Sequence, residues 1–225
     1  MSSDLDALRL TLWLAAISTA VLLLLATPLA WWLARTRSRW KHPLEAAVAL
    51  PLVLPPTVLG FYLLLALGPR GPLGSAWGAL GGEPLVFSFA GLVVGSVVYS
   101  LPFVVQPIQA SFEDLGRGPL EAAAMLGAGP LDRFFTVALP LARRGFLVAS
   151  VLGFAHTLGE FGVVLMIGGN IPERTRVVSI AIYDRVESLD YAAAHQLSAI
   201  LVAVSFLVLL IVFATQRRIG PASRL

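Results

Sequence analysis

Five long stretches without basic or acidic side chains, save one acid, constrain this sequence more than any other feature. Each has 24 to 29 residues, and Glu160 is the single charged residue inside them. A helix needs roughly 20 apolar residues to cross about 30 Å of hydrocarbon. The pattern therefore predicts an all-α integral membrane protein with about five transmembrane helices. The expected spans cover about residues 10–34, 46–68, 85–110, 146–168 and 193–215.

The composition agrees with a membrane protein and excludes other classes. Hydrophobic residues make up 57% of the chain and charged residues 13%, against roughly 45–50% and 25% in soluble domains. Cysteine is absent, which excludes disulfides and thiolate metal sites. The one lysine, Lys41, follows Trp40, so the chain has no Gly-Lys-Ser/Thr loop for nucleotide phosphates. We expect a single transmembrane domain over residues 8–216 and a short basic tail over 217–225, with no catalytic or metal-binding residues.

The distribution of Lys and Arg predicts the orientation in the membrane. Eleven lie in the segments after the first and third spans and in the C-terminal tail, and five lie on the opposite side. Cytoplasmic loops carry the excess of basic residues. We therefore expect the N-terminus outside and the C-terminus inside, and we interpret the net charge of +3 as an orientation signal and not as a nucleic-acid surface.

Prolines interrupt the second and third predicted spans. They are Pro51, Pro55 and Pro56 in the second, and Pro102 and Pro107 in the third. A proline removes a helical hydrogen bond, and the freed carbonyl must find protein or water within the membrane. We expect helix breaks that line a translocation path, with simple kinking for packing as the alternative. The polar residues beside these prolines, which could face a passing solute, are Thr57, Ser100 and Gln106.

Glu160 lies near the middle of the fourth predicted span, four residues after His156. An ionisable residue in a span is costly and is by default a functional hypothesis. The spacing places both side chains on one helix face. A gate, a polar pair along the path and a proton relay are the functional interpretations. A pair that fixes helix packing is the structural one, and Gly159 and Gly162 would let another backbone approach.

The segment over residues 113–145 is expected to be cytoplasmic and to contain two short helices. They begin alike, at Gly118-Pro119 and at Gly129-Pro130, with an acid two residues after each proline. Proline suits the first helical position, and an acid complements the positive helix end. The first helix is rich in alanine, so its narrow face suits a docking element, while an ordinary surface hairpin is the alternative.

This segment resembles the EAA loop of ABC importer permeases. The family pattern is Glu-Ala-Ala, three residues, Gly, nine residues, Ile, one residue and Leu-Pro. Only Val137 departs from it, in place of isoleucine. The resemblance implies a coupling helix that sits in a groove of a separate ATP-binding subunit, which holds ATP and magnesium, so no cofactor is expected on this chain. The residues implied in ATPase coupling are Glu121, Ala122, Ala123 and Gly127.

Three further segments are similar to molybdate permease subunits of such importers. They are residues 50–60, residues 157–162, and Asn170-Ile171-Pro172 followed by Thr175. Glu173 departs from the family pattern, which has glycine there. Tungstate and sulfate permeases share parts of these segments. The resemblance therefore implies an oxyanion importer, with molybdate first, tungstate also plausible and sulfate as the alternative.

The resemblance also implies the partners and the location. It predicts two copies of this chain, two ABC ATP-binding subunits and an extracytoplasmic oxyanion-binding protein, in the cell membrane of a prokaryote and without nucleic acid. The loops over residues 68–83 and 169–190 would meet the binding protein, and the second is expected to contain a helix over residues 178–187. A proton-coupled secondary carrier that uses His156 and Glu160 and a membrane scaffold are the alternatives from the residues alone.

Overall fold

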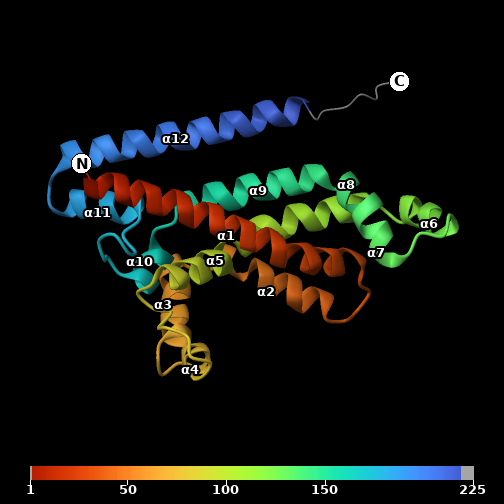
Figure 1. Cartoon of the computed structure of the whole chain (residues 1–225), viewed down its shortest axis with the longest axis horizontal. Coiled ribbons are helices and arrows are strands. Elements are labelled where there is room, and N and C mark those ends of the chain that lie inside the picture. Colours follow the sequence, from red (N-terminus) through yellow and green to blue (C-terminus); the bar gives the residue numbers. More distant parts are fainter. Residues whose placement is uncertain (1, 219–225) are drawn as a thin grey trace.

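The computed structural model describes residues 2–218, and all regular elements within that range are helices. Figure 1 shows an elongated bundle in which the longest helices run along the long axis. Three helices are long and apolar enough to cross a membrane, and two sharply bent helix pairs raise the number of candidate spans to as many as five. The three long helices are α1 (Ser2–Arg35), α5 (Phe89–Asp114) and α12 (Tyr191–Arg218).

The core of the bundle lies between α1, α5 and α9 (Arg143–Leu158). Leu22, Ala26, Ala30 and Leu33 have no exposed surface, and their spacing of three and four residues places them on one face of α1. Two of the four are alanines, and small residues let helices approach closely inside a membrane. This face packs against buried residues of α5 and α9 that include Val104, Ile108 and Ala149.

The second predicted span is broken at adjacent prolines. Its helices are α2 (Lys41–Val53), α3 (Pro56–Leu67) and α4 (Pro72–Ala79). Leu54 and Pro55 are extended, with ψ angles of 135° and 136°, because a residue that precedes proline is disfavoured in the helical conformation. The chain bends by 114° there, so α3 and α4 project from the side of the bundle (Figure 1). The expected break is confirmed at Pro55 and Pro56, whereas Pro51 lies inside α2.

The prediction that Pro102 and Pro107 break the third span is wrong. Both lie within α5, which continues from Phe89 to Asp114. A single proline removes one helical hydrogen bond and kinks a helix, and neighbouring helices support the remainder. Pro102 is buried in the bundle, where α1 and α9 pack against α5. Isolated prolines in a packed helix are therefore tolerated here, and two in succession are not.

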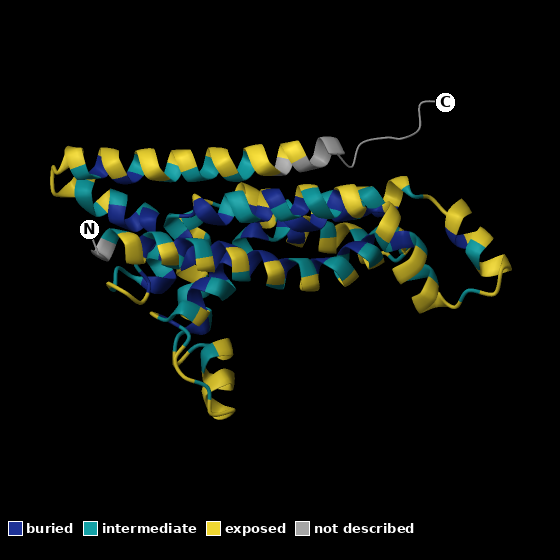
Figure 2. Cartoon of the chain, turned by 45° about the horizontal axis from the view of Figure 1, so that its top comes forward, coloured by how far each residue is buried: buried dark blue, intermediate teal, exposed yellow. Residues whose placement is uncertain are grey.

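The range expected for the fourth span contains two helices. α9 ends at Leu158, and α10 (Gly162–Gly168) begins after residues 159–161. The loop that follows contains α11 (Val178–Glu187), so the helix predicted over residues 178–187 is confirmed. α12 then runs along the outside of the bundle, mostly exposed to its surroundings (Figure 2). Residues 219–225, most of the expected basic tail, lie outside the described residues.

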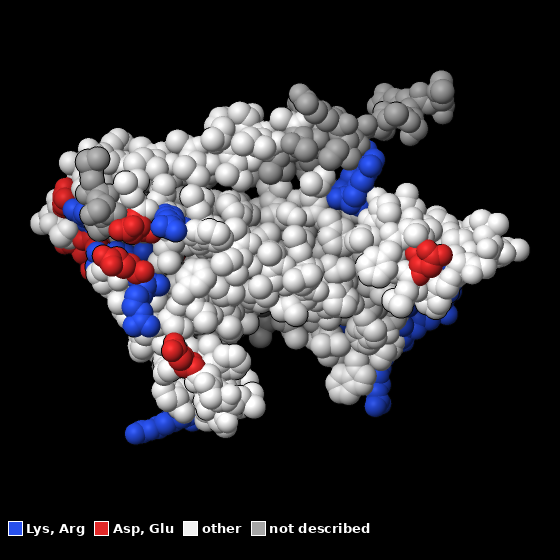
Figure 3. Space-filling model, viewed as in Figure 1, with Lys and Arg blue, Asp and Glu red and all other residues white. Residues whose placement is uncertain are grey.

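The distribution of charge fits a protein that crosses a membrane. Figure 3 shows that Lys, Arg, Asp and Glu gather towards the two ends of the long axis on the face in view, and a broad band without them lies between. One end carries the start of α1 together with α11. The other end carries α6 (Gly118–Met125), α7 (Pro130–Arg133), a π-helical turn (Phe134–Ala138) and α8 (Leu139–Leu141). The two short helices predicted to begin at Gly118 and Gly129 are confirmed, with Gly129 capping the second.

Candidate functional site

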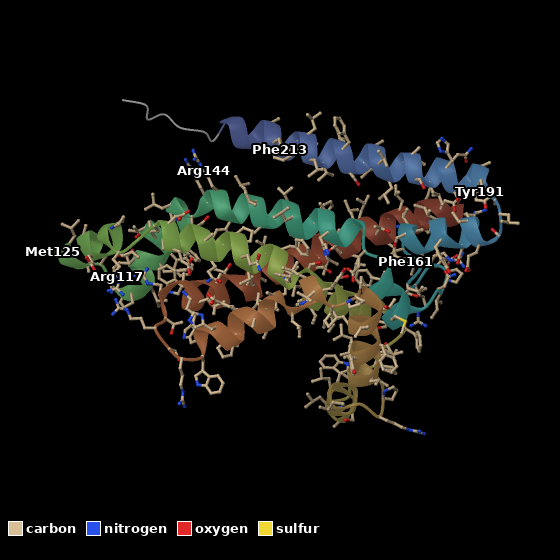
Figure 4. The ribbon with its side chains drawn as sticks, turned by 180° about the vertical axis from the view of Figure 1, so that it is seen from behind. Arg117, Met125, Arg144, Phe161, Tyr191 and Phe213 are labelled. Carbon is tan, nitrogen blue, oxygen red and sulfur yellow. The ribbon has the colours of Figure 1, made fainter. Side chains whose placement is uncertain are left out.

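The first candidate region is the EAA segment, defined as residues 118–141, at one end of the bundle. α6 begins with Pro119 in its first turn and carries Glu121 there as well. Leu120 is buried against the core, whereas Met125 and Leu126 each have 90% of their surface exposed. Figure 4 shows Met125 at the far tip of α6, away from the bundle. The helix thus presents an apolar tip to its surroundings while one side chain anchors its base.

The end of α6 explains why glycine occupies position 127. Gly127 has a φ of +89°, in the left-handed region that glycine adopts at little cost. Its N–H donates to the Ala124 carbonyl at 3.0 Å, and the N–H of Ala128 donates to the Ala123 carbonyl at 3.0 Å. These two bonds satisfy carbonyls that a helix end leaves unpaired, and glycine is the usual residue at this position of the cap. The glycine therefore fixes the direction in which the chain leaves α6.

Aromatic packing attaches the EAA segment to the bundle. Trp31 of α1 meets Phe112 of α5 edge-on, with ring centroids 4.9 Å apart, and meets Phe134 of the π-helical turn at 5.0 Å. Phe146 of α9 also meets Phe112 edge-on, at 5.9 Å. Such edge-to-face pairs add to the stabilisation from buried area. Movement of the EAA segment is therefore linked by direct contact to α1 and α5, and through Phe112 to α9.

The second candidate region is the helix-break region, defined as residues 54–57 and 159–162 with the facing residues 96–103 of α5. A Cβ added to Gly162 would lie 2.8 Å from the Cβ of Pro56, and one added to Gly60 would lie 2.8 Å from the Cβ of Met166. Glycine at these positions lets α10 pack directly on the start of α3. The breaks in the second and fourth predicted spans therefore pack against one another.

Glu160 lies between the two halves of the broken helix and is 4% exposed. Both of its carboxylate oxygens are buried without a hydrogen bond of normal geometry among the described residues, and so is the Ser96 hydroxyl, although Ser96 lies close enough to act on the carboxylate as a weak donor. Its backbone carbonyl is engaged, since the Ser179 hydroxyl donates to it at 2.6 Å. Burial of an acid without a hydrogen bond of normal geometry is costly, and such groups mark functional positions in membrane helices.

His156 belongs to a separate polar cluster on the same side of α5. Its Nδ1 and the Ser100 hydroxyl are hydrogen-bonded at 2.8 Å, and Ser100 also lies 3.2 Å from the Thr157 hydroxyl. The imidazole stacks on Phe103 with ring centroids 4.0 Å apart and contacts Tyr99 at 4.6 Å. The structure therefore brings two predicted path residues, Ser100 and His156, into direct contact.

One expectation about this region is corrected, and the other predicted path residues are placed by the structure without a test of their role. His156 and Glu160 do not share a helix face, because α9 ends at Leu158 and Glu160 lies in the break. Gln106 is exposed and lies apart from the cluster, in a groove of about 300 Å³ between α2 and α5 with Glu45 and Gln109. Thr57 and Pro55 are exposed, and Pro56 contacts the break through Gly162.

The groove beside Gln106 contains the carboxylate of Glu45, whose charged form is stabilised by two neighbouring side chains. Partial burial acts to raise the pKa of Glu45, but a hydrogen bond from Gln109 at 2.7 Å and the charge of Lys41 at 3.7 Å outweigh it and hold the pKa below its usual value. Glu45 is thus a stable carboxylate that ties the start of α2 to α5.

Sequence reasoning identified Ser100 but missed Ser96, Tyr99, Phe103 and Ser179, which the fold places in or against the helix-break region. Ser96 and Ser100 are one turn apart on α5, so their polar side chains share a face, and Tyr99 and Phe103 are four residues apart in the same way. This spacing is a signal available in the sequence. Ser179 gave no such signal, because it reaches Glu160 from α11, nineteen residues further along the chain.

A helical bundle with a charge-poor middle, an exposed capped helix at one end and two broken helices in its interior has the architecture of a membrane transport permease. The comparison of sequences identifies the family of transport proteins to which the chain belongs. The model of the family described as binding-protein-dependent transport system inner membrane component matches residues 26–224, and the chain belongs to this family. It is therefore a multi-pass inner membrane component of a binding-protein-dependent transporter.

Curated relatives match nearly the whole chain. The chain is 62% identical, over 95% of both proteins, to the "Molybdenum transport system permease protein ModB" of Azotobacter vinelandii. It is 38% identical to the protein of the same name from Escherichia coli (strain K12), over 81% of this chain and 80% of that protein. A probable sulfate transport system permease protein from Zygnema circumcarinatum is 35% identical over 92% of this chain and 72% of that protein.

A solved structure shares the fold. The bacterial ABC transporter involved in the import of the acidic polysaccharide alginate superposes with a TM-score of 0.81, over 98% of this chain and 81% of that chain. The sequence identity is 18%, so this likeness concerns the fold alone.

Proposed function

We propose that this chain is the membrane-spanning permease subunit of an ATP-driven molybdate importer, which also accepts tungstate. The 62% identity to a relative named as a molybdenum transport permease carries the choice of substrate. The chain forms the translocation path, and a separate ABC ATP-binding subunit hydrolyses ATP with magnesium. Two copies of this chain pair with two such subunits, and an extracytoplasmic binding protein delivers the oxyanion.

The EAA segment is the proposed contact with the ATPase. Its exposed apolar tip, Met125 and Leu126, is the kind of surface that a groove on a partner buries. Its buried base and its aromatic contacts with α1 and α5 transmit movement to the long helices. ATP binding would then shift the population between inward and outward openings of the path. Glu121, Ala122 and Ala123 lie in the helix that makes this contact, and Gly127 follows its end.

The orientation follows from this assignment. The end that carries α6 to α8 faces the cytoplasm, so the N-terminus lies outside and the C-terminus inside. The same end carries the excess of Lys and Arg expected in cytoplasmic segments. The opposite end, with the loops over residues 68–83 and 169–190, meets the binding protein.

The helix-break region is the proposed gate of the path. It combines a buried acid without a hydrogen bond of normal geometry, Glu160, with the Ser100–His156 pair and with two interrupted helices. Interrupted backbone at membrane depth is typical of places where transporters line a cavity. The absence of a contact between Glu160 and His156 argues against the proton-coupled carrier, because a relay through these two residues has no direct link.

Reconstitution tests the proposal. The chain, its ATPase and its binding protein in proteoliposomes should take up molybdate in an ATP-dependent way, and tungstate should compete better than sulfate. Sulfate uptake without molybdate uptake would overturn the substrate and favour the sulfate alternative. Uptake that follows a proton gradient without ATP would overturn the ABC mechanism itself.

The EAA assignment has its own test within the same complex. Glu121→Arg should weaken association with the ATPase and leave membrane insertion intact, because a first-turn acid is replaced by a charge that the positive helix end repels. Asp132→Arg is the matched control, since Asp132 is the first-turn acid of the neighbouring α7. Unchanged ATPase association in Glu121→Arg, measured by co-purification, would refute the assignment.

A further inference from the structure

An open pocket of about 750 Å³ lies where α1 ends and the EAA segment begins. It is bounded by the end of α1, the start of α2, the end of α5 and the short helices α6 and α7. Phe112 and Leu120 form part of its floor, and both are buried in the core. The ionisable residues that line it are Arg35, Lys41, Glu113, Arg117, Glu121 and Arg133.

Basic side chains outnumber acidic ones in this lining by four to two. Lys41 and Glu113 neutralise one another, since the Lys41 Nζ lies 3.2 Å from a Glu113 carboxylate oxygen. Arg35, Arg117 and Arg133 form no ion pair with any residue of the described part of the chain. The pocket therefore gathers three guanidinium groups that form no ion pair within residues 2–218.

The guanidinium groups of Arg117 and Arg133 are close enough to Arg35 to repel its charge. Partial burial lowers the pKa of Arg35, the charges of Arg117 and Arg133 lower it further, and Glu121 offsets only part of this. Arg35 is also held in place, with its guanidinium 4.4 Å from the centre of the Trp31 ring. The lining thus has a net formal charge of +2 that a bound anion would balance.

We propose that this pocket binds a tetrahedral oxyanion, supplied either as a free ion in the cytoplasm or as the phosphate of an anionic lipid. The fork of N–H donors on arginine matches the oxygens of such groups, and the bonds are strengthened by charge. Arg35 ends the apolar stretch of α1 beside Trp31, at the level where headgroups meet a span. This inference goes beyond the proposed function, since no transported substrate needs to pass through the pocket.

A bound oxyanion would connect parts of the molecule that move with different elements. Arg35 belongs to α1, Arg117 precedes α6 and Arg133 ends α7. An ion that contacts all three favours conformations in which the EAA segment lies against α1, as it does in this structure. Occupancy is therefore expected to slow exchange of backbone amides within the EAA segment.

Direct binding on the full-length chain tests the proposal and separates the two sources. In nanodiscs of neutral phosphatidylcholine, molybdate and inorganic phosphate are titrated by equilibrium binding. In nanodiscs that also contain phosphatidylglycerol, co-purified lipid is counted by native mass spectrometry. Binding in the first experiment identifies a free ion and binding in the second identifies a lipid, and each supports the site. Absence of binding in both overturns it.

Single substitutions connect the binding to the pocket. Arg35→Gln, Arg117→Gln and Arg133→Gln should each weaken binding by about tenfold, because each removes a charged hydrogen-bond donor. Arg37→Gln is the matched control, since Arg37 is exposed in the loop after α1 and does not line the pocket. Equal losses in the control and in the pocket variants would overturn the proposal, because they would reflect general charge.

Hydrogen exchange supplies a readout that general charge would not change. Added anion should slow amide exchange in residues 117–133 of the unsubstituted chain but not in Arg133→Gln. No slowing at an anion concentration that saturates binding would overturn the bridging role. Because these measurements use the permease alone, failure of the transport proposal would not affect them, and their failure would leave the transport proposal intact.

Discussion

The EAA segment and the helix-break region both depend on glycine, for opposite reasons. Gly127 in the EAA segment has a φ of +89° and open space around it, with no atom within 4 Å of an added Cβ. Gly162 in the helix-break region has no such backbone constraint, but its Cβ would lie 2.8 Å from the Cβ of Pro56. The exposed region is thus specified by backbone conformation and the interior region by contact, so substitutions should affect the two in different ways.

The largest effect is expected at Gly162, where an added side chain would collide with Pro56. Gly162→Ala should cost about 1–3 kcal/mol of stability, because the Pro56 ring cannot move aside without shifting α3. Uptake should be lost, and the melting temperature of the purified chain should fall. Gly159→Ala is the control from the same break, since the nearest atom to its added Cβ is 3.9 Å away. Similar stability in the two variants would contradict the conclusion that contact with Pro56 requires glycine at position 162.

The second-largest effect is expected at Glu160, the acid of the helix-break region. Glu160→Gln removes a carboxylate whose oxygens have no hydrogen bond of normal geometry among residues 2–218, so assembly with the ATPase should be retained. Stability should change by less than about 1 kcal/mol, since no pair is broken, while the uptake rate should fall if the acid acts in the gate. Loss of assembly would assign Glu160 to packing, and normal uptake would remove both roles.

The exposed region should respond to backbone conformation alone. Gly127→Ala should cost about 1 kcal/mol at the end of α6 and weaken ATPase association about fivefold, because alanine resists positive φ. Membrane insertion should not change. Gly118→Ala, at the start of the same helix, where φ is not positive and no atom lies within 4 Å of an added Cβ, is the matched control. Equal binding by both variants in a pull-down titration would contradict the role of the cap.

The smallest effect is expected at the opposite end of the molecule. Glu173 has a φ of +63°, so the turn keeps a glycine-like backbone although the family's usual glycine is absent. Glu173→Gly should raise stability by up to about 1 kcal/mol, seen as a higher melting temperature. Arg174→Gly, where φ is not positive, should give no gain. A fall in stability with Glu173→Gly would mean that its carboxylate, in a pocket with Arg9, matters more than the strain.

Much of the fold could be predicted because apolar length and turn chemistry are local properties. The helical membrane class, the two short helices that begin at Gly118 and Gly129, and the helix over residues 178–187 all follow from local residue patterns and agree with the structure. The prolines were predicted less well. Adjacent Pro55 and Pro56 break their span, whereas Pro102 and Pro107 do not break α5, because packing of neighbouring helices decides whether one missing hydrogen bond is tolerated.

For the candidate sites, too, location could be predicted from the sequence and contacts could not. The EAA segment could be located from its spacing, and Glu160 could be chosen as a candidate from its place in an apolar stretch. The contacts of these residues could not be predicted. The sequence pairs Glu160 with His156, but the structure ends α9 between them and pairs His156 with Ser100, 56 residues earlier in the chain.

The sequence by itself determined that this protein is a helical membrane protein with a short, glycine-capped helix in its EAA segment, because hydrophobic length, helix starts and caps depend on neighbouring residues. Only the tertiary structure decided that the two broken spans meet at Pro56 and Gly162, and that three arginines from separate elements share one pocket. Those features depend on which helices pack together. Such packing joins Pro56 to Gly162, 106 positions apart, and Arg35 to Arg117 and Arg133, 82 and 98 positions apart, and no local pattern encodes it.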